Sequence, residues 1–186
     1  QQPEYYFDWS TLASTSVAGQ GFPYETALPS YYTDFSDSRS VVFNITNAVI
    51  NDASAVNAYD KALALQTFLK DGNASTEFKL NFDGSGLVDG EDLAQFMLEI
   101  ANEGTCAEFA TTYVTMARVA GLPARLVSGF KGGDWTGNGY AVGAQHLRTW
   151  AEVRLQQSSS SGGLDFGWIP FDPCPDAAEL DVQNVL

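Results

Sequence analysis

The chain has 186 residues, of which 45% are apolar and 13% aromatic, and this composition predicts a single folded domain with a sizeable core. Its formal net charge of −14, from 23 acidic and 9 basic side chains, excludes nucleic acid and anionic membrane surfaces as expected partners. No apolar run approaches the roughly 20 residues that cross a bilayer, so we expect no direct membrane insertion of this segment.

The beginning of the chain has no helical or strand period. Residues 1–40 are rich in Tyr, Phe, Ser, Pro and Asp, and we interpret them as an extended arm held on the main domain by its aromatic side chains. The β-branched content of residues 40–45 predicts a short strand. We therefore divide the chain into an N-terminal arm (1–55), a core (56–176) and an acidic C-terminal tail (177–186).

The ends and the sequons indicate the location of the protein. The chain begins without an initiator Met and without a charged, apolar signal segment, which indicates a processed or excised piece. Sequons at Asn44 and Asn73 permit export. We expect an extracellular or cell-surface location, as an excised ectodomain or a processed exported protein. The two cysteines, Cys106 and Cys174, leave open either one disulfide or one catalytic thiol.

Residues 57–70 have the end signals and the period of a helix. Asn57 is a suitable N-cap, and Gly72 follows the last turn. The expected buried face comprises Ala62, Leu65, Phe68 and Leu69. Residues 78–82 then alternate like a strand.

Residues 81–92 have the spacing of an EF-hand-type calcium loop. Oxygen-bearing side chains stand at loop positions 1, 3, 5, 9 and 12, with glycine at position 6 and an aliphatic residue at position 8. The loop resembles the calcium loop of dockerin modules, which can end in Asp. The alternative is a Gly/Asp-rich surface turn, since position 1 is Asn and the preceding segment is strand-like. The candidate Ca²⁺ ligands are Asn81, Asp83, Ser85, Leu87, Asp89 and Asp92.

A short helix over 92–100 is followed by a turn, a second helix and a strand over 104–130. Apolar residues of the short helix are Leu93, Phe96, Met97 and Ile100. Thr105 can cap the second helix, and Glu108 three residues later completes a capping box. Cys106 then lies in the first turn, where free N–H groups and the helix dipole favour a thiolate. The other interpretation is a small buried thiol.

The C-terminal half supplies candidate partners for this cysteine. Residues 131–143 are predicted to form a loop of Gly, Asp and Asn, with Trp135 and Tyr140, suited to a flexible rim, and residues 146–155 and 166–171 predict two strands. A nucleophilic thiol needs a base and a third group that orients the base. His146 is the only histidine, and Asp172 follows the last strand. The expected apolar side of the first strand comprises Leu147, Ala151, Val153 and Leu155.

Five segments in order carry a family pattern: YDKALALQ (59–66), GTCAEFA (104–110), ARVAGLPAR (117–125), WAEV (150–153) and GWIPFDP (167–173). They resemble the transglutaminase-like core, a papain-like superfamily of cysteine acyl-transfer enzymes and their inactive relatives. The resemblance implies an α+β fold, with the cysteine-bearing helix packed on an antiparallel β-sheet. By motif, Cys106 corresponds to the family's nucleophile and Asp172 to its third member.

The resemblance also implies a function. We expect thiol-based acyl transfer or hydrolysis at a peptide or protein amide, with no cofactor required for the chemistry and a protein or peptide as substrate. The catalytic candidates are Cys106, His146 and Asp172, and the candidate substrate-binding residues are Trp135, Arg148 and Trp150.

The family's histidine position is occupied by Arg148, which stays protonated and cannot act as a base. Either the site is degenerate and the domain is an extracellular binding or scaffold module, or His146 takes over. The second option needs a bulge or register shift between His146 and Trp150, with Arg148 beside Asp172 or the thiolate.

Cys174 replaces the family's usual threonine two residues after Asp172. In an oxidising compartment it could pair with Cys106 and silence the thiol. Alternatively, it is a passive substitution.

Overall fold

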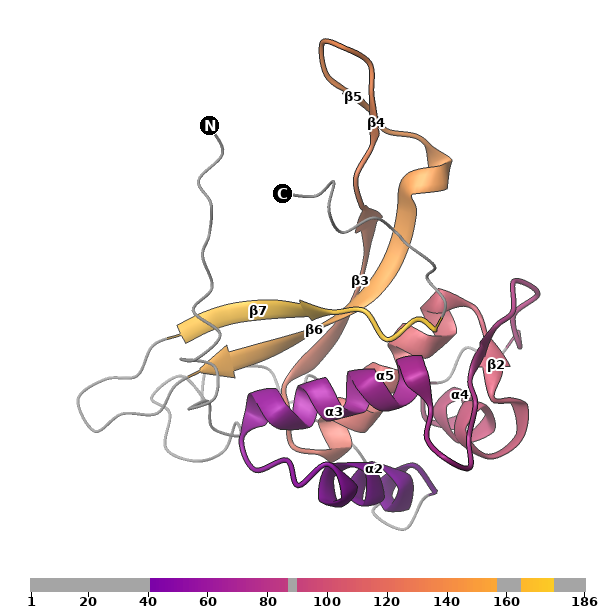
Figure 1. Ribbon diagram of the computed structural model, residues 1–186, viewed down its shortest axis with the longest axis vertical. Coiled ribbons are helices and arrows are strands. Elements are labelled where there is room, and N and C mark those ends of the chain that lie inside the picture. The colour runs from indigo at the N-terminus through magenta and orange to yellow at the C-terminus, as the bar shows by residue number, and fades with distance from the viewer. Residues whose placement is uncertain (1–40, 87–89, 157–164, 176–186) are drawn as a thin grey trace.

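The computed structural model describes residues 41–86, 90–156 and 165–175. Helices gather on one side of a three-stranded sheet, and a two-stranded ribbon leaves this body (Figure 1). Residues 1–40 of the proposed arm (1–55) and the whole of the proposed tail (177–186) lie outside the described residues. Within the described part, no helix combines the length and apolar character needed to cross a bilayer.

The first described element is the helix α2 (Val41–Asp52), so the strand expected at 40–45 is wrong. Its buried residues recur every three or four positions, and this helical period outweighs the β-branched content of its first turn. The buried set is Val42, Thr46, Val49 and Ile50. The packed core therefore includes α2, which precedes the expected boundary at residue 56.

Helix α3 (Ala58–Asp71) confirms the second prediction, with Asn57 as N-cap and Gly72 after its last turn. All four residues expected on its apolar face are buried. The strand expected at 78–82 is reduced to β1 (Lys79–Leu80), which pairs in parallel with β2 (Glu103–Gly104).

The expected helix at 92–100 is α4 (Gly90–Phe96) followed by the π-helical turn η3 (Met97–Ala101). Leu93 and Met97 are buried as expected, but the Ile100 side chain is 69% exposed. A π-turn has wider i→i+5 spacing, which rotates the residues after it away from the face predicted for an α-helix.

Helix α5 (Cys106–Val119) packs on an antiparallel sheet of β3 (Ala124–Phe130), β6 (Leu147–Gln156) and β7 (Asp165–Phe171), with strand order β3-β6-β7. Helices α2, α3 and α4 also contact α5. The class is α+β, as expected, and the cysteine-bearing helix lies at the centre of the fold.

Aromatic side chains of α5 hold the layers together. The Tyr113 ring is fully buried and stacks on Phe171 of β7 at 5.7 Å between ring centroids. Its hydroxyl donates a hydrogen bond of 3.0 Å to the Ala62 carbonyl of α3, while burial raises the pKa of this phenol well above its usual value. Tyr113 thereby fixes α5 between α3 and β7.

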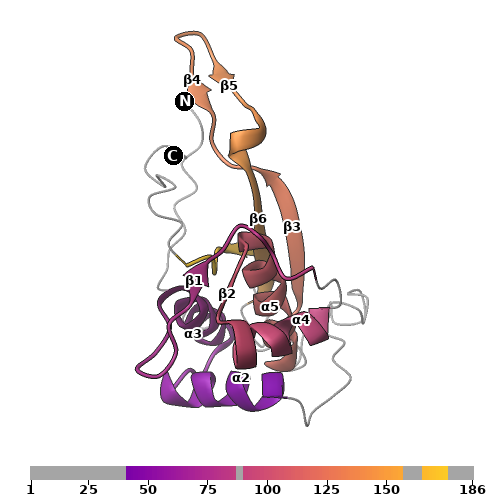
Figure 2. The ribbon, with the colours of Figure 1, turned by 90° about the vertical axis from the view of Figure 1, so that its right-hand side faces the viewer.

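Strands β3 and β6 continue past the end of β7 as a two-stranded ribbon. It is extended by β4 (Asp134–Trp135), β5 (Tyr140–Ala141) and the 3₁₀ turn η4 (Ala144–His146), and it projects from the helices in Figure 2. On β6, the residues expected to be apolar and buried are so except Leu147, which is 53% exposed. This position lies on the ribbon, where no helix covers the sheet.

Candidate functional site

The N-terminus of α5 has the predicted capping box. Thr105 Oγ1 accepts from the Glu108 N–H at 3.3 Å, and Glu108 Oε2 accepts from the Thr105 N–H at 2.8 Å. Glu108 Oε1 also accepts from the Ser85 N–H, which ties the preceding loop to the helix. Burial raises the pKa of Glu108, but the hydrogen bonds from Ser85 and Thr105 outweigh burial, so the net pKa is lowered. Cys106 is consequently the first residue of a firmly capped helix.

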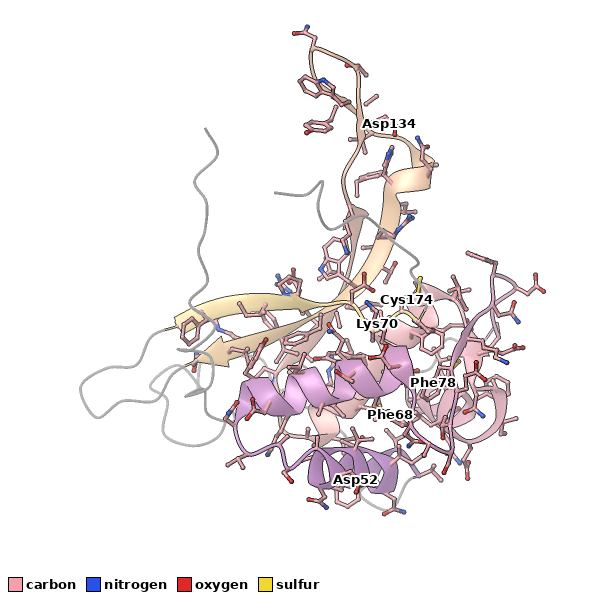
Figure 3. The ribbon with its side chains drawn as sticks, viewed as in Figure 1. Asp52, Phe68, Lys70, Phe78, Asp134 and Cys174 are labelled. Atoms are coloured by element: carbon pink, nitrogen blue, oxygen red, sulfur yellow. A yellow bond between two sulfur atoms is a disulfide. The ribbon has the colours of Figure 1, made fainter. Side chains whose placement is uncertain are left out.

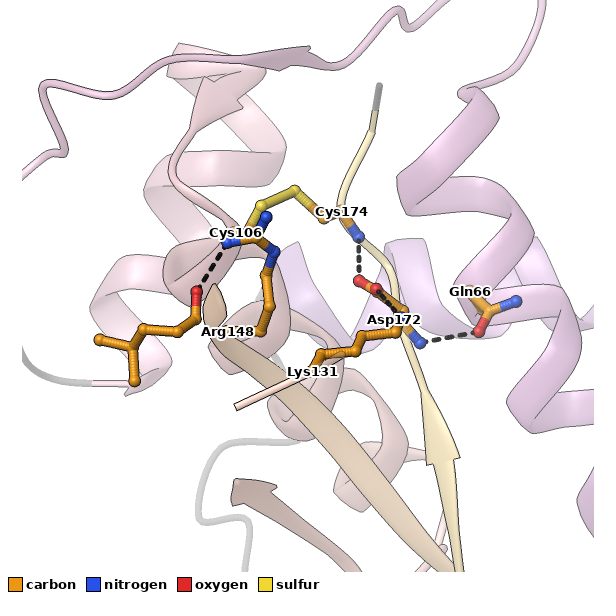
Figure 4. Close-up of polar contacts among 7 residues, drawn as sticks. Gln66, Cys106, Lys131, Arg148, Asp172 and Cys174 are labelled. Atoms are coloured by element: carbon orange, nitrogen blue, oxygen red, sulfur yellow. Dashed lines mark hydrogen bonds and ion pairs between the residues drawn. A yellow bond between two sulfur atoms is a disulfide. The ribbon is translucent and has the colours of Figure 1, made fainter. Parts of the chain in front are cut away.

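Cys106 is joined to Cys174 in a disulfide, with 4.9 Å between their Cα atoms (Figure 4). The sequence left open a disulfide between Cys106 and Cys174 or a passive substitution at Cys174, and the structure has the disulfide. Cys174 is buried, with 1% of its surface exposed. Because a nucleophile must be a thiolate, Cys106 cannot attack a substrate in this state.

Asp172 lies just after β7 and makes three polar contacts with other described residues. Its N–H donates to Gln66 Oε1 of α3 at 2.9 Å, and its Oδ1 accepts from the Cys174 N–H at 3.4 Å. Its Oδ2 lies 3.2 Å from Lys131 Nζ. The cation beside this carboxylate is therefore Lys131, at the end of β3, and neither His146 nor Arg148.

His146 makes its described contacts on the ribbon. Its Nδ1 accepts from the Gly143 N–H at 2.9 Å, and its Nε2 is 3.7 Å from Asp134 Oδ1. Figure 3 shows Asp134 out on the ribbon and Cys174 where the sheet meets the helices. Within the described part of the chain, His146 contacts neither Cys106 nor Asp172.

The bulge that would bring His146 inward is not found in β6. Pairing between β3 and β6 is regular from Leu147 to Val153, and the register shift in this strand falls at Leu155/Gln156, on the pairing with β7. The strand begins at Leu147, so His146 belongs to the turn before it.

The three candidate substrate-binding residues occupy two places. Arg148 and Trp150 share one face of β6, since they are two residues apart. The Trp150 ring lies over Gly129, where an added Cβ would be only 2.9 Å from Trp150 Cη2. Trp135 is 63% exposed on the β4–β5 hairpin, with its ring centroid 5.1 Å from that of Tyr140.

The proposed calcium loop is described only in part, because Leu87 and Asp89 lie outside the described residues. Asn81 Oδ1 accepts from the Asp83 N–H, and Asn81 Nδ2 donates to Glu103. Gly86, at loop position 6, has a φ of 73°, as a sharp turn there requires. The described residues contain no group of three His, Cys, Asp or Glu side chains suited to a metal. Calcium binding stays a prediction, which a thermal shift with calcium against chelator tests.

Sequence reasoning missed two residues that hold Asp172. Lys131 directly follows the strand that was expected to end at residue 130, so a lysine at that position could have been recognised as a candidate partner for Asp172. Gln66 lies in a segment that carries the family pattern, but its contact with a residue 106 positions away depends on tertiary structure.

Comparisons with known proteins agree with this fold. Residues 45–173 match the Transglutaminase-like superfamily. The uncharacterized protein YebA of Bacillus subtilis (strain 168) is 27% identical over 123 residues, which cover 63% of this chain and 15% of YebA.

Two crystal structures of the periplasmic domain of TgpA from Pseudomonas aeruginosa are also similar. One has a TM-score of 0.58 at 19% identity, covering 80% of this chain and 49% of that domain. The other, bound to ethylmercury, has a TM-score of 0.51 at 22% identity, with 71% and 42% covered. The chain spans less than half the length of each relative. With the match covering α3, α5 and the whole sheet, the chain belongs to the transglutaminase-like superfamily.

Proposed function

We propose that this domain is a non-catalytic, exported member of its superfamily, which binds a protein or peptide without acyl chemistry. The observation that carries the proposal is the Cys106–Cys174 disulfide, because it occupies the family's nucleophile. The other two catalytic positions also lack the arrangement that acyl transfer needs. Arginine replaces the histidine at position 148, and Lys131 neutralises Asp172.

Acyl transfer needs both a thiolate and a group that can take and return a proton. The disulfide removes the first, and Arg148 cannot supply the second, since a guanidinium stays protonated. His146, with its contacts to Gly143 and Asp134, is held by the ribbon. The disulfide, the arginine at position 148 and the ion pair at Asp172 all favour recognition over catalysis.

Export is part of this proposal. Structural disulfides persist in oxidising compartments and are rare in reducing ones. The similar TgpA domain is described as periplasmic. We therefore place this domain outside the cytoplasm, at the cell surface or beyond it.

The test compares oxidised protein with a Cys106→Ser variant. We expect no iodoacetamide adduct on the oxidised chain near neutral pH, by mass spectrometry. We also expect neither hydrolysis of peptide amides nor incorporation of an amine into a glutamine-containing protein. Turnover by the oxidised chain that Cys106→Ser abolishes would contradict the proposal.

A second candidate is a latent enzyme that reduction activates. It is favoured by the position of Cys106 at the first residue of a capped helix, where the dipole stabilises a thiolate once the disulfide opens. In this candidate Cys106 attacks an amide, His146 shuttles the proton and Asp172 orients the base, after His146 leaves Asp134.

Reduction separates the two candidates. For the non-catalytic module, we expect the reduced chain to be alkylated at Cys106 yet to show no turnover. Turnover that appears on reduction and disappears in His146→Asn would establish the latent enzyme. The alkylation rate serves as a control, because it reports whether Cys106 has been freed.

A further inference from the structure

Arg148 is a cation without an acidic partner among the described residues. One guanidinium nitrogen, Nη1, donates to the carbonyls of Gln145 and Leu147 at 2.9 and 2.8 Å. A guanidinium has five N–H donors, so those on Nε and Nη2 remain available there. The sheet's other arginines differ, because Arg125 pairs with Glu152 and Arg154 with Asp165.

Two features neighbour Arg148 along the β3–β6 pair: the Trp150 ring, on the same face of β6, and the Lys131–Asp172 ion pair. Gly129 is its direct partner across the β3–β6 pair, and the Trp150 ring lies over that glycine. Lys131, two residues beyond Gly129, is a diagonal neighbour at roughly 7–8 Å between Cα atoms. Since Lys131 is paired with Asp172, that carboxylate is already compensated and Arg148 adds an unbalanced positive charge.

We propose that Arg148 binds a carboxylate, and that the ligand is a peptide whose free C-terminus follows an apolar side chain. A guanidinium fork with free donors matches a carboxylate in a bidentate arrangement. The half-buried Trp150 ring, which packs over Gly129 on the same face of the strand, is the apolar group that the last side chain of the ligand would contact. This inference rests on the proposed non-catalytic function, because it converts the family's proton-transfer position into a recognition position.

The experiment is an NMR titration of oxidised, isotope-labelled protein with N-acetylphenylalanine and, as neutral control, N-acetylphenylalaninamide. We expect the acid to shift the signals of the Arg148 side chain and the Trp150 indole N–H. We expect the amide to bind at least about tenfold more weakly, and the affinity for the acid to fall as salt is raised. Equal binding of acid and amide would overturn the proposal.

Variants identify the cation. Arg148→Gln should weaken binding of the acid at least about tenfold, and Arg148→Lys should lose part of the affinity, because charge remains but the fork does not. Arg154→Gln is the matched control on the same strand and face, and it should bind like the parent. If Arg148→Gln gives the NMR spectrum of a folded protein and binds the acid with unchanged affinity, Arg148 is not the carboxylate-binding residue.

Failure of this inference is distinguishable from failure of the proposed function. Turnover by the oxidised protein removes the non-catalytic function whatever the titration gives. Loss of carboxylate selectivity without any turnover removes only the role of Arg148.

Discussion

The residues expected to form one triad are divided between two regions that differ in how they are held. Around the disulfide, Cys106 and Asp172 are anchored by α5, α3 and the end of β3. On the ribbon, His146 contacts a backbone N–H and Asp134, whose side chain is 73% exposed. The first region is tied to the core by bonds across the fold, whereas the described contacts of the His146 side chain are made to other residues of the ribbon.

The difference arises from strand register. A residue inside a paired strand keeps its place relative to the sheet, because a shift of one residue would reverse every side chain. Arg148 is inside β6, so strand pairing determines the position of its side chain. His146 precedes the strand, so the η4 turn determines the position of its side chain. Four perturbations test this contrast.

The largest effect is expected from removing the disulfide. It closes a loop with a sequence separation of 68, and replacing both cysteines by serine should lower the free energy of unfolding by about 4 kcal/mol. Urea unfolding with and without reductant measures this loss. The reduced parent is the control and should match the double variant. A loss below about 1 kcal/mol would mean that other contacts hold the region.

Gly129→Ala should lower the free energy of unfolding by about 1–3 kcal/mol, because the added Cβ would meet the Trp150 ring at 2.9 Å. Tryptophan fluorescence during urea unfolding reports both the stability and the displaced ring. Gly139→Ala is the matched control, since a Cβ added there would meet nothing within 4 Å and its φ is not left-handed. Equal effects at the two glycines would contradict the packing described for Trp150.

Glu108→Gln should lower the free energy of unfolding by about 1–2 kcal/mol at neutral pH, because it weakens the capping box and the Ser85 contact. The lowered pKa of Glu108 means that the unfolded chain takes up the proton first on acidification. Its stabilising contribution is therefore full above the unfolded pKa of about 4.3 and is lost as pH falls through the folded pKa.

The measurement is urea unfolding between pH 6 and pH 3. Stability of the Gln variant should fall less steeply over this range than that of the parent. Glu99→Gln, at an exposed residue hydrogen-bonded by Gln95, should keep the parent's slope. Parallel curves for the parent and Glu108→Gln would refute the role assigned to this carboxylate.

The smallest effect is expected for His146→Asn, below about 1 kcal/mol in the free energy of unfolding, since Asp134, the carboxylate near its ring, is exposed. Thermal unfolding measures it, with Asp134→Asn as the comparison. A loss as large as that of the disulfide variant would show that the two regions are energetically coupled.

Much of the fold is predictable because its signals are local. The caps of α3 and the capping box at Thr105 each depend on residues only a few positions apart in the sequence, and both are confirmed. The strand expected at 40–45 is wrong. That prediction used only the strand preference of β-branched residue types and left out the helical spacing of the apolar residues that continues through α2. Ile100 is misplaced by the sequence pattern because the π-turn changes the helical phase, and nothing in the residue types announces it.

The site is less predictable because its bonds join distant segments. The Cys106–Cys174 bond depends on where β7 ends relative to α5, and the Lys131–Asp172 pair spans 41 positions. The start of β6 at Leu147 decides the position of His146, and the alternating pattern does not resolve that boundary to one residue.

The disulfide also determines how the domain carries tension along the chain. All three sheet strands lie between Cys106 and Cys174, so a force applied at the two ends passes through the sulfur bridge and bypasses them. While the bond is intact, the bridged segment cannot be stretched, which shortens the fully extended chain by roughly 220–245 Å. A reductant would release that length, and only then could pulling unravel the sheet.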